Sequence, residues 1–211
     1  MAKKNAKDGI SMVQTAEGAL TEVHDMLNRM VELATQAANG TYATEDRGYL
    51  DLEFQELIAE IDRIGSNSNF NGQKLFNAAS AVTLQIGEKG EAIYQLSFTI
   101  SDLDSAELGI NNAAVSSFTA ATAAISSVNA AIKTVNEMRA TLGATQNRLE
   151  HTINNLGVMT ENIQDAESTI RDTDIADEMM AYTKNNILIQ SAQAMLAQAN
   201  QVPQGVLQLL Q

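Results

Sequence analysis

One apolar stripe constrains the fold of this chain more than any other feature. Within residues 118–170 an apolar residue recurs every seven positions, at Ala121, Val128, Val135, Leu142, Leu149, Leu156, Ile163 and Ile170. Such a repeat is typical of a helix that packs lengthwise against other helices. A single helix of this length measures roughly 80 Å at about 1.5 Å per residue, far longer than an average globular helix. We therefore expect a long helix in an elongated bundle.

A companion stripe is expected on the same helix, apolar at first and mixed later. Its positions are Phe118, Ile125, Ile132, Arg139, Gln146, Ile153, Thr160 and Glu167. Two stripes three or four residues apart form the seam of a coiled coil. We expect both to face neighbouring helices.

Two shorter helical patterns precede the long one. Residues 4–38 place apolar or small side chains at alternating steps of three and four, and Asn39-Gly40 ends that pattern. Residues 45–64 repeat the spacing, at Leu50, Phe54, Leu57, Ile61 and Ile64. The polar run at residues 65–69 is expected to break the second helix, and Asn71-Gly72 is a turn signal.

The middle of the chain changes its periodicity. Residues 82–86 and 93–100 alternate apolar and polar side chains, and Gly87 to Gly90 separate them. Alternation around a glycine-containing turn predicts a β-hairpin. The fold class predicted is therefore mainly α: an elongated antiparallel helical bundle or coiled coil, with a small β-hairpin region and a C-terminal helical tail.

Composition excludes several classes of function. The formal net charge is −13 and no run of Lys or Arg builds a basic face, so we expect no binding to nucleic acid or to anionic membranes. Cysteine is absent, which excludes disulfides and thiolate metal sites. We find no signal peptide and no apolar run long enough to span a bilayer.

The last segment carries no charged side chain after Lys184. One interpretation is an ordinary terminal helix that packs on its own core. We favour burial against neighbours in an assembly or against a partner, because solvent-facing helices usually display charges. The side chains expected to take part are Ile175, Met179, Ile187, Leu188, Met195, Leu196, Val206, Leu207, Leu209 and Leu210.

Nothing in the sequence predicts an enzyme or a cofactor. The two histidines, His24 and His151, have no second ligand at metal-binding spacing, and phosphate-binding glycine patterns are missing. Carboxylate pairs such as Glu60 and Asp62 stand two residues apart, which does not place them on one helix face, and we interpret them as solvated.

Four segments carry a resemblance to a known family. Residues 7–20 read KDGISMVQTAEGAL and residues 69–75 read NFNGQKL; residues 142–156 read LGATQNRLEHTINNL and residues 194–204 read AMLAQANQVPQ. In this order they resemble the conserved core segments of bacterial flagellins. The resemblance implies the structural subunit of a motility filament. Such a subunit is secreted through the flagellar export apparatus, is cytoplasmic before export, and assembles extracellularly with other flagellin subunits.

The resemblance also implies a domain organisation. Residues 3–77 correspond to the N-terminal core helices, 78–117 to a hairpin and connector, 118–174 to the long C-terminal core helix, and 175–211 to the terminal tail. Flagellins normally begin with about fifty more residues, which supply an inner N-terminal helix, and outer domains are nearly absent here. We therefore expect a subunit truncated at the N-terminus, which does not polymerise by itself.

Several partners follow from the resemblance alone. The tail is expected to bind the flagellar export chaperone, and a flagellin-binding assembly regulator is a further partner. Host Toll-like receptor 5 is implied as a receptor, with Arg29, Leu33 and Glu53 at the contact positions. Val31 stands where strong activators commonly carry an arginine.

Two alternatives remain at the level of sequence. A filament-junction protein of the flagellum shares the long core helices. A helical secreted adaptor shares the heptads but does not require an uncharged tail rich in Gln and Ala.

Overall fold

The computed structural model describes residues 1–76, 80–87, 89–172 and 174–209, and for residue 80 and residues 201–209 it describes the backbone alone. Four helices make up most of the chain: α1 (Ala2–Ala37), α2 (Thr44–Asn67), α3 (Phe118–Arg171) and α4 (Ile175–Leu209). The chain divides into two compact units, Met1–Met159 and Thr160–Gln211, so that α3 contributes to both. The mainly helical class predicted from the sequence is confirmed.

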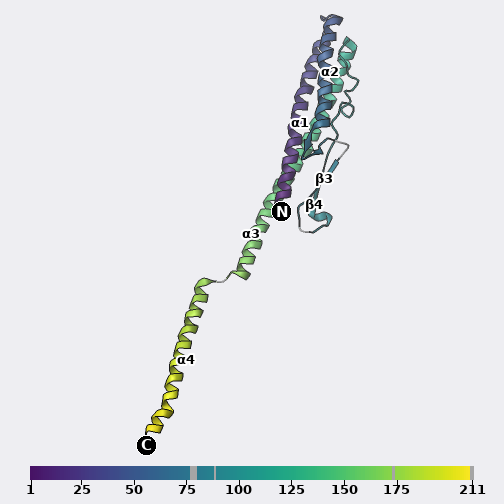
Figure 1. The fold of residues 1–211 in the computed structure, drawn as a ribbon. Helices are drawn as coiled ribbons and strands as arrows, with labels where there is room; N and C mark the ends of the chain where they lie inside the picture. Colours follow the sequence, from purple (N-terminus) through teal and green to yellow (C-terminus); the bar gives the residue numbers. More distant parts are fainter. Residues whose placement is uncertain (77–79, 88, 173, 210–211) are drawn as a thin grey trace. The chain divides into compact units, whose positions relative to one another are not determined.

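The first unit is a bundle of α1, α2 and the early part of α3, which lie side by side (Figure 1). Helices α1 and α3 run antiparallel. Near the start of α1, a Cβ added at Gly9 would lie 3.5 Å from Cδ1 of Leu149, late in α3. Further along α1, Glu17 lies 3.8 Å from Arg139, about three turns closer to the start of α3 than Leu149. The antiparallel bundle expected from the heptads is therefore present in this unit.

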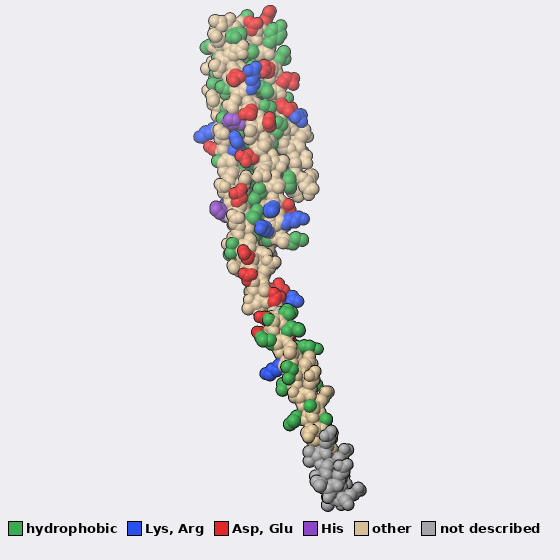
Figure 2. All heavy atoms as spheres, turned by 90° about the vertical axis from the view of Figure 1, so that its left-hand side faces the viewer, with side chains coloured by type: hydrophobic (Ala, Val, Ile, Leu, Met, Phe, Trp, Pro, Cys, Tyr) green, Lys and Arg blue, Asp and Glu red, His purple; other side chains and the backbone are tan. Residues whose placement is uncertain are grey.

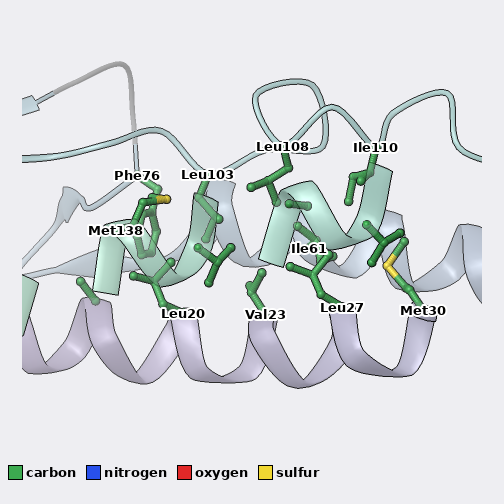
Figure 3. Packing of buried hydrophobic residues seen from close by; sticks show 14 of the residues in the cluster. Leu20, Val23, Leu27, Met30, Ile61, Phe76, Leu103, Leu108, Ile110 and Met138 are labelled. Atoms are coloured by element: carbon green, nitrogen blue, oxygen red, sulfur yellow. The ribbon is translucent and has the colours of Figure 1, made fainter. Parts of the chain in front are cut away.

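The seam of α1 is buried as its spacing predicts. Figure 3 shows Leu20, Val23, Leu27 and Met30 projecting from α1 toward the side chain of Ile61 and the other helices. All five side chains are fully buried. Steps of three and four residues keep them on one face, where they meet the neighbouring helices along several turns.

The companion stripe predicted for α3 is wrong. The heptad positions are buried from Ala121 to Leu149, but their buried companions are Ala124, Ala131, Met138 and Thr145. Phe118 is 55% exposed, and Ile125 and Ile132 pack only at the edge of the core. Small alanine side chains permit close approach of helices, which places them at the centre of the seam and the larger isoleucines on its flank.

Helix α2 is longer than expected. The residues interpreted as a breaker, 65–67, still belong to the helix, and Gly65 is buried. A Cβ at Gly65 would lie 1.8 Å from the main-chain oxygen of Leu103. Gly65 therefore allows the main chain around Leu103 to pack directly against α2, and it does not end the helix.

A two-stranded hairpin packs against α1. Strands β3 (Ser80–Gln85) and β4 (Gln95–Ile100) pair antiparallel, and Leu96, Phe98 and Ile100 are buried. The strand predicted from residue 93 begins later, because residues 92–94 form a short 3-10 turn, η1 (Ala92–Tyr94). A smaller pair, β1 (Asn69–Phe70) and β2 (Gln73–Lys74), closes over the predicted turn at Asn71-Gly72.

Residues 101–117, which we call the strap, follow α2 in the opposite direction. Asp62 accepts hydrogen bonds from the N–H of Ser105 at 2.7 Å and from its hydroxyl at 3.0 Å. Asp51, nearer the start of α2, accepts one from the N–H of Val115 at 2.7 Å. The strap buries four apolar side chains against the bundle: Leu103, Leu108, Ile110 and Val115. Asp62 is thus a structural anchor, which corrects its interpretation as a solvated carboxylate.

The second unit contains the end of α3 and helix α4. Asp174 begins α4 by accepting hydrogen bonds from the N–H groups of Ala176 at 2.9 Å and Asp177 at 3.3 Å. Capping of free N–H groups by a carboxylate stabilises a helix start. Among the described residues, no helix combines the length and apolarity needed to cross a bilayer.

Candidate interaction surfaces

The apolar side chains of α4 form the first candidate surface, which we call the tail surface. Its described members are more than half exposed: Ile175, Met179, Ile187, Leu188, Met195 and Leu196. Green side chains are visible along this helix in Figure 2. Val206, Leu207, Leu209 and Leu210, predicted to take part, lie outside the residues whose side chains the structure describes. Among the described side chains of α4, none is buried on the chain's own core.

The tail surface occupies more than one side of α4. At about 100° per residue, Ile175, Met179 and Leu196 lie on one side, and Ile187 and Met195 lie on the other. A surface helix of a globular protein normally has a single apolar side, whereas a helix that is apolar all round is usually buried. The distribution favours a helix that neighbours surround.

The heptad stripe of α3 changes its burial along the helix. Leu149 is fully buried, whereas Ile163 is 62% exposed and Ile170 is 83% exposed. The sequence repeat continues without a break across this change. The second unit therefore presents an apolar stripe that nothing in the described part of that unit covers.

The predicted receptor residues lie where α1 faces α2. Arg29 donates hydrogen bonds to Glu53 at 2.8 Å and to Glu32 at 2.9 Å. Both pair members are about half exposed, with 48% of the Arg29 side chain and 46% of the Glu53 side chain accessible. The hydrogen bond to Glu53 is the largest cause that raises the pKa of Arg29, followed by that to Glu32.

Leu33 does not share this exposure. Its side chain is fully buried beside the other α1 seam residues. The structure thus brings Arg29 and Glu53 together at the surface, whereas the side chain of Leu33 lies in the core and offers no accessible surface to a partner.

Side chains suited to catalysis do not converge in the described residues. The ring of His24 makes a hydrogen bond with Asn28 at 3.1 Å and faces Asp25 at 3.7 Å, contacts within its own helix. Glu60 pairs with Arg63, whose hydrogen bond lowers the pKa of Glu60. No group of three or more His, Asp or Glu in the described ranges has metal-binding geometry.

Sequence reasoning did not find three polar anchors. Arg47 donates from Nε to the main-chain oxygen of Ala37 at 2.8 Å and from Nη2 to that of Asn39 at 3.0 Å, so it holds the end of α1. Asp51 and Asp62 hold the strap. These contacts join residues distant in sequence or separated by a turn, and no local pattern signals them.

Comparison with known proteins supports the resemblance at both ends of the chain. The family model for the bacterial flagellin N-terminal helical region matches residues 1–81, and that for the C-terminal helical region matches residues 125–210. A flagellin of Halalkalibacterium halodurans is 49% identical over 210 residues, which cover 99% of this chain and 77% of that protein. This chain belongs to the bacterial flagellin family. Flagellins are structural components of the extracellular flagellar filament.

Further flagellins agree with this membership. The flagellin of Bacillus subtilis is 45% identical over 246 residues, covering 100% of this chain and 80% of that protein. The flagellar filament 33 kDa core protein of Treponema phagedenis is 43% identical over 226 residues, covering 99% and 78%. The crystal structure of Bacillus cereus flagellin has a TM-score of 0.63 and 32% identity, and covers 72% of this chain and 88% of that chain.

The four segments that carried the resemblance all fall within the matched flagellin regions. Residues 7–20 and 69–75 lie in the N-terminal match, and residues 142–156 and 194–204 lie in the C-terminal match. Since the match extends over the whole chain at high identity, the sequence-based identification of a flagellin is confirmed.

Proposed function

We propose that this flagellin joins the filament by burying the tail surface against neighbouring subunits, and that the flagellar export chaperone covers the same surface before assembly. The observation that carries the proposal is the exposure of the six described members of the tail surface, each more than half accessible. Several large apolar side chains exposed on one helix are typical of an interaction site.

The free energy available from the tail surface favours a partner that surrounds the helix. Full burial of a large apolar side chain contributes about 1.5–3 kcal/mol, so six half-exposed side chains offer roughly 5–9 kcal/mol in total. Association opposes this with an estimated 4–15 kcal/mol of lost translational and rotational freedom. A partner that touched only one side of α4 would recover too little, and we therefore expect contacts on both sides.

Calorimetric titration of this chain with the export chaperone of the same bacterium tests the proposal. We expect one-to-one binding, and a fall in affinity of at least about tenfold for Ile187→Ser and again for Leu196→Ser, since about 1.4 kcal/mol corresponds to a tenfold change. The two side chains lie on opposite sides of α4. Gln190→Ser, an exposed polar position between them, is the matched control and is expected to bind as the parent does.

Methionine oxidation supplies a second readout of the same complex. Met179, Met180 and Met195 are exposed, whereas Met12 and Met30 are buried in the bundle. Dilute peroxide should oxidise the three tail methionines in the free chain and spare them in the complex, with Met12 and Met30 unchanged in both. Absence of binding, or binding that leaves the tail methionines reactive, refutes the chaperone site on α4.

A flagellin-binding assembly regulator is proposed as a further partner of this chain. The physical requirement is the same as for the chaperone, a partner that gains from covering exposed apolar side chains. Its titration against the preformed chaperone complex distinguishes a shared site on α4 from a separate one.

We also propose that host Toll-like receptor 5 contacts Arg29 and Glu53. Arginine is enriched among residues that dominate binding energy, and this one is half exposed and held in position by two carboxylates. We expect Arg29→Ala and Glu53→Ala each to reduce affinity for the receptor ectodomain by about tenfold or more, measured by surface plasmon resonance.

A charge exchange separates recognition from structural support. The double variant Arg29→Glu with Glu53→Arg retains an ion pair between α1 and α2 but reverses the charges presented to a partner. The exchange loses the pair with Glu32, which contributes no more than about 1 kcal/mol because both side chains are largely exposed, so the variant should still fold and should fail to bind. Unchanged affinity in the single variants, or full affinity in the exchanged pair, contradicts a receptor contact at this position.

A further inference from the structure

The turn between α1 and α2 contains one of the two Asn-Gly pairs of the chain, Asn39-Gly40. Both residues are exposed and lie outside the helices. A Cβ added at Gly40 would meet no atom within 4 Å. The turn therefore leaves space around the main-chain nitrogen of Gly40.

The side-chain amide of Asn39 turns back toward the main chain that follows it. Its Oδ1 accepts a hydrogen bond from the N–H of Thr41 at 3.2 Å, the contact that defines an Asx turn. The ring closed by this bond contains both Cγ of Asn39 and the peptide nitrogen of Gly40, and it restricts the rotation of the side chain that carries Cγ. In the part of the chain that the structure describes, the N–H of Gly40 makes no hydrogen bond.

We propose that Asn39 is a site of spontaneous modification, at which the folded protein converts asparagine to aspartate and isoaspartate. The main-chain nitrogen of Gly40 loses its proton and bonds to Cγ of Asn39. The bond from Cγ to Nδ2 breaks, and ammonia leaves with the transferred proton, giving a five-membered cyclic imide. One water then opens the ring at either carbonyl.

The hydrogen bond from Thr41 assists the first step. Negative charge develops on Oδ1 when the nitrogen of Gly40 adds to Cγ, and a positioned N–H donor stabilises such an oxyanion. Glycine also contributes directly, because it places no side chain beside the attacking nitrogen and permits the backbone rotation that ring closure requires.

The isoaspartate product places its new carboxylate next to a positively charged side chain. Opening at the main-chain side turns the former main-chain carbonyl of Asn39 into a carboxylate. That oxygen already accepts hydrogen bonds from Nη2 of Arg47 at 3.0 Å and from the N–H of Tyr42 at 3.4 Å. The guanidinium would then face a full negative charge, and charge-assisted hydrogen bonds are the stronger kind.

The second pair, Asn71-Gly72, is an internal control. Asn71 has φ 51° and Gly72 has φ 81°, the left-handed conformations of a tight hairpin turn. Phe70 and Gln73 pair directly across it. Bringing Cγ of Asn71 to the nitrogen of Gly72 requires rotation of that turn, which breaks the pairing, so the fold protects this site.

Peptide mass spectrometry of the aged protein tests the proposal. Native protein and protein unfolded in urea are incubated at mildly alkaline pH and digested with trypsin, which releases residues 30–47 and 64–74 as separate peptides. We expect the ratio of native to unfolded rate to be close to one at Asn39. At Asn71 it should be at least about tenfold lower, since a barrier raised by about 1.4 kcal/mol slows a reaction tenfold.

The variant Gly40→Ala identifies the attacking group. The space around Gly40 is open and its φ is not in the left-handed region, so the variant should fold as the parent does. We expect the reaction at Asn39 to slow by about tenfold or more, because the methyl group crowds the nitrogen and lowers the frequency of ring closure. A native rate at Asn39 as strongly suppressed as at Asn71, or an unchanged rate in Gly40→Ala, overturns the proposal.

Discussion

Replacing Gly65 by Ala is expected to lower the free energy of unfolding of the first unit by about 2–4 kcal/mol. The added Cβ would lie 1.8 Å from the main-chain oxygen of Leu103, so either α2 or the strap has to move. Displacement of the strap exposes Leu103, whose burial contributes about 1.5–3 kcal/mol, and strains the hydrogen bonds between Asp62 and Ser105 at about 1 kcal/mol each. The higher helix propensity of Ala returns only about 1 kcal/mol.

The matched control is the same substitution in the same helix. A Cβ at Gly48 meets nothing within 4 Å, so Gly48→Ala is expected to stabilise α2 by about 0.5–1 kcal/mol. Urea unfolding followed by circular dichroism gives both values. If Gly65→Ala proved neutral or stabilising, the close approach of the strap to α2 would be wrong.

The helices of this chain could be predicted because each signal is local and repeated. Steps of three and four residues located the buried face of α1, and the seven-residue repeat located the heptad positions of α3. The companion stripe was assigned one residue out of phase. The reason is physical: apolar character favoured Ile125 and Ile132, but Ala124 and Ala131 fit the narrow space between close helices.

The strap and the end of α2 could not be predicted, because their determinants lie far apart in sequence. Gly65 looked like a helix breaker, and only the proximity of Leu103 explains why a glycine is needed inside the helix. Asp62 looked solvated, yet it holds Ser105, which is 43 residues away. A single sequence shows neither contact.

The candidate surfaces were predicted unequally. The absence of charge after Lys184 predicted a helix whose apolar side chains are buried only by a partner. In the free chain the described tail side chains are exposed, as this prediction requires. Leu33 was assigned by resemblance alone, and the structure places its side chain in the core of the bundle. Spacing placed Arg29 and Leu33 on the same helix but did not distinguish a surface position from a core position.

Two substitutions on one stripe of α3 should differ strongly in their effect on the stability of the free protein. Leu149→Ala is expected to destabilise the first unit by about 2–5 kcal/mol, because it removes a fully buried side chain and leaves a cavity beside Gly9. Ile163→Ala, two heptads later, is expected to change stability by no more than about 0.5 kcal/mol, because that side chain is 62% exposed. Hydrogen exchange of the α1 amides, read in increasing urea, reports the first unit separately from α4.

The difference between these two variants tests whether the whole seven-residue repeat stabilises the subunit or only its first part does. Sequence periodicity treats positions 149 and 163 alike, and only burial separates them. If Ile163→Ala destabilised the free protein as much as Leu149→Ala does, the stripe would be covered within the chain and the second unit would need no partner. A neutral Ile163→Ala, with a destabilising Leu149→Ala, means that the early heptads fold the subunit and the later ones remain available for assembly.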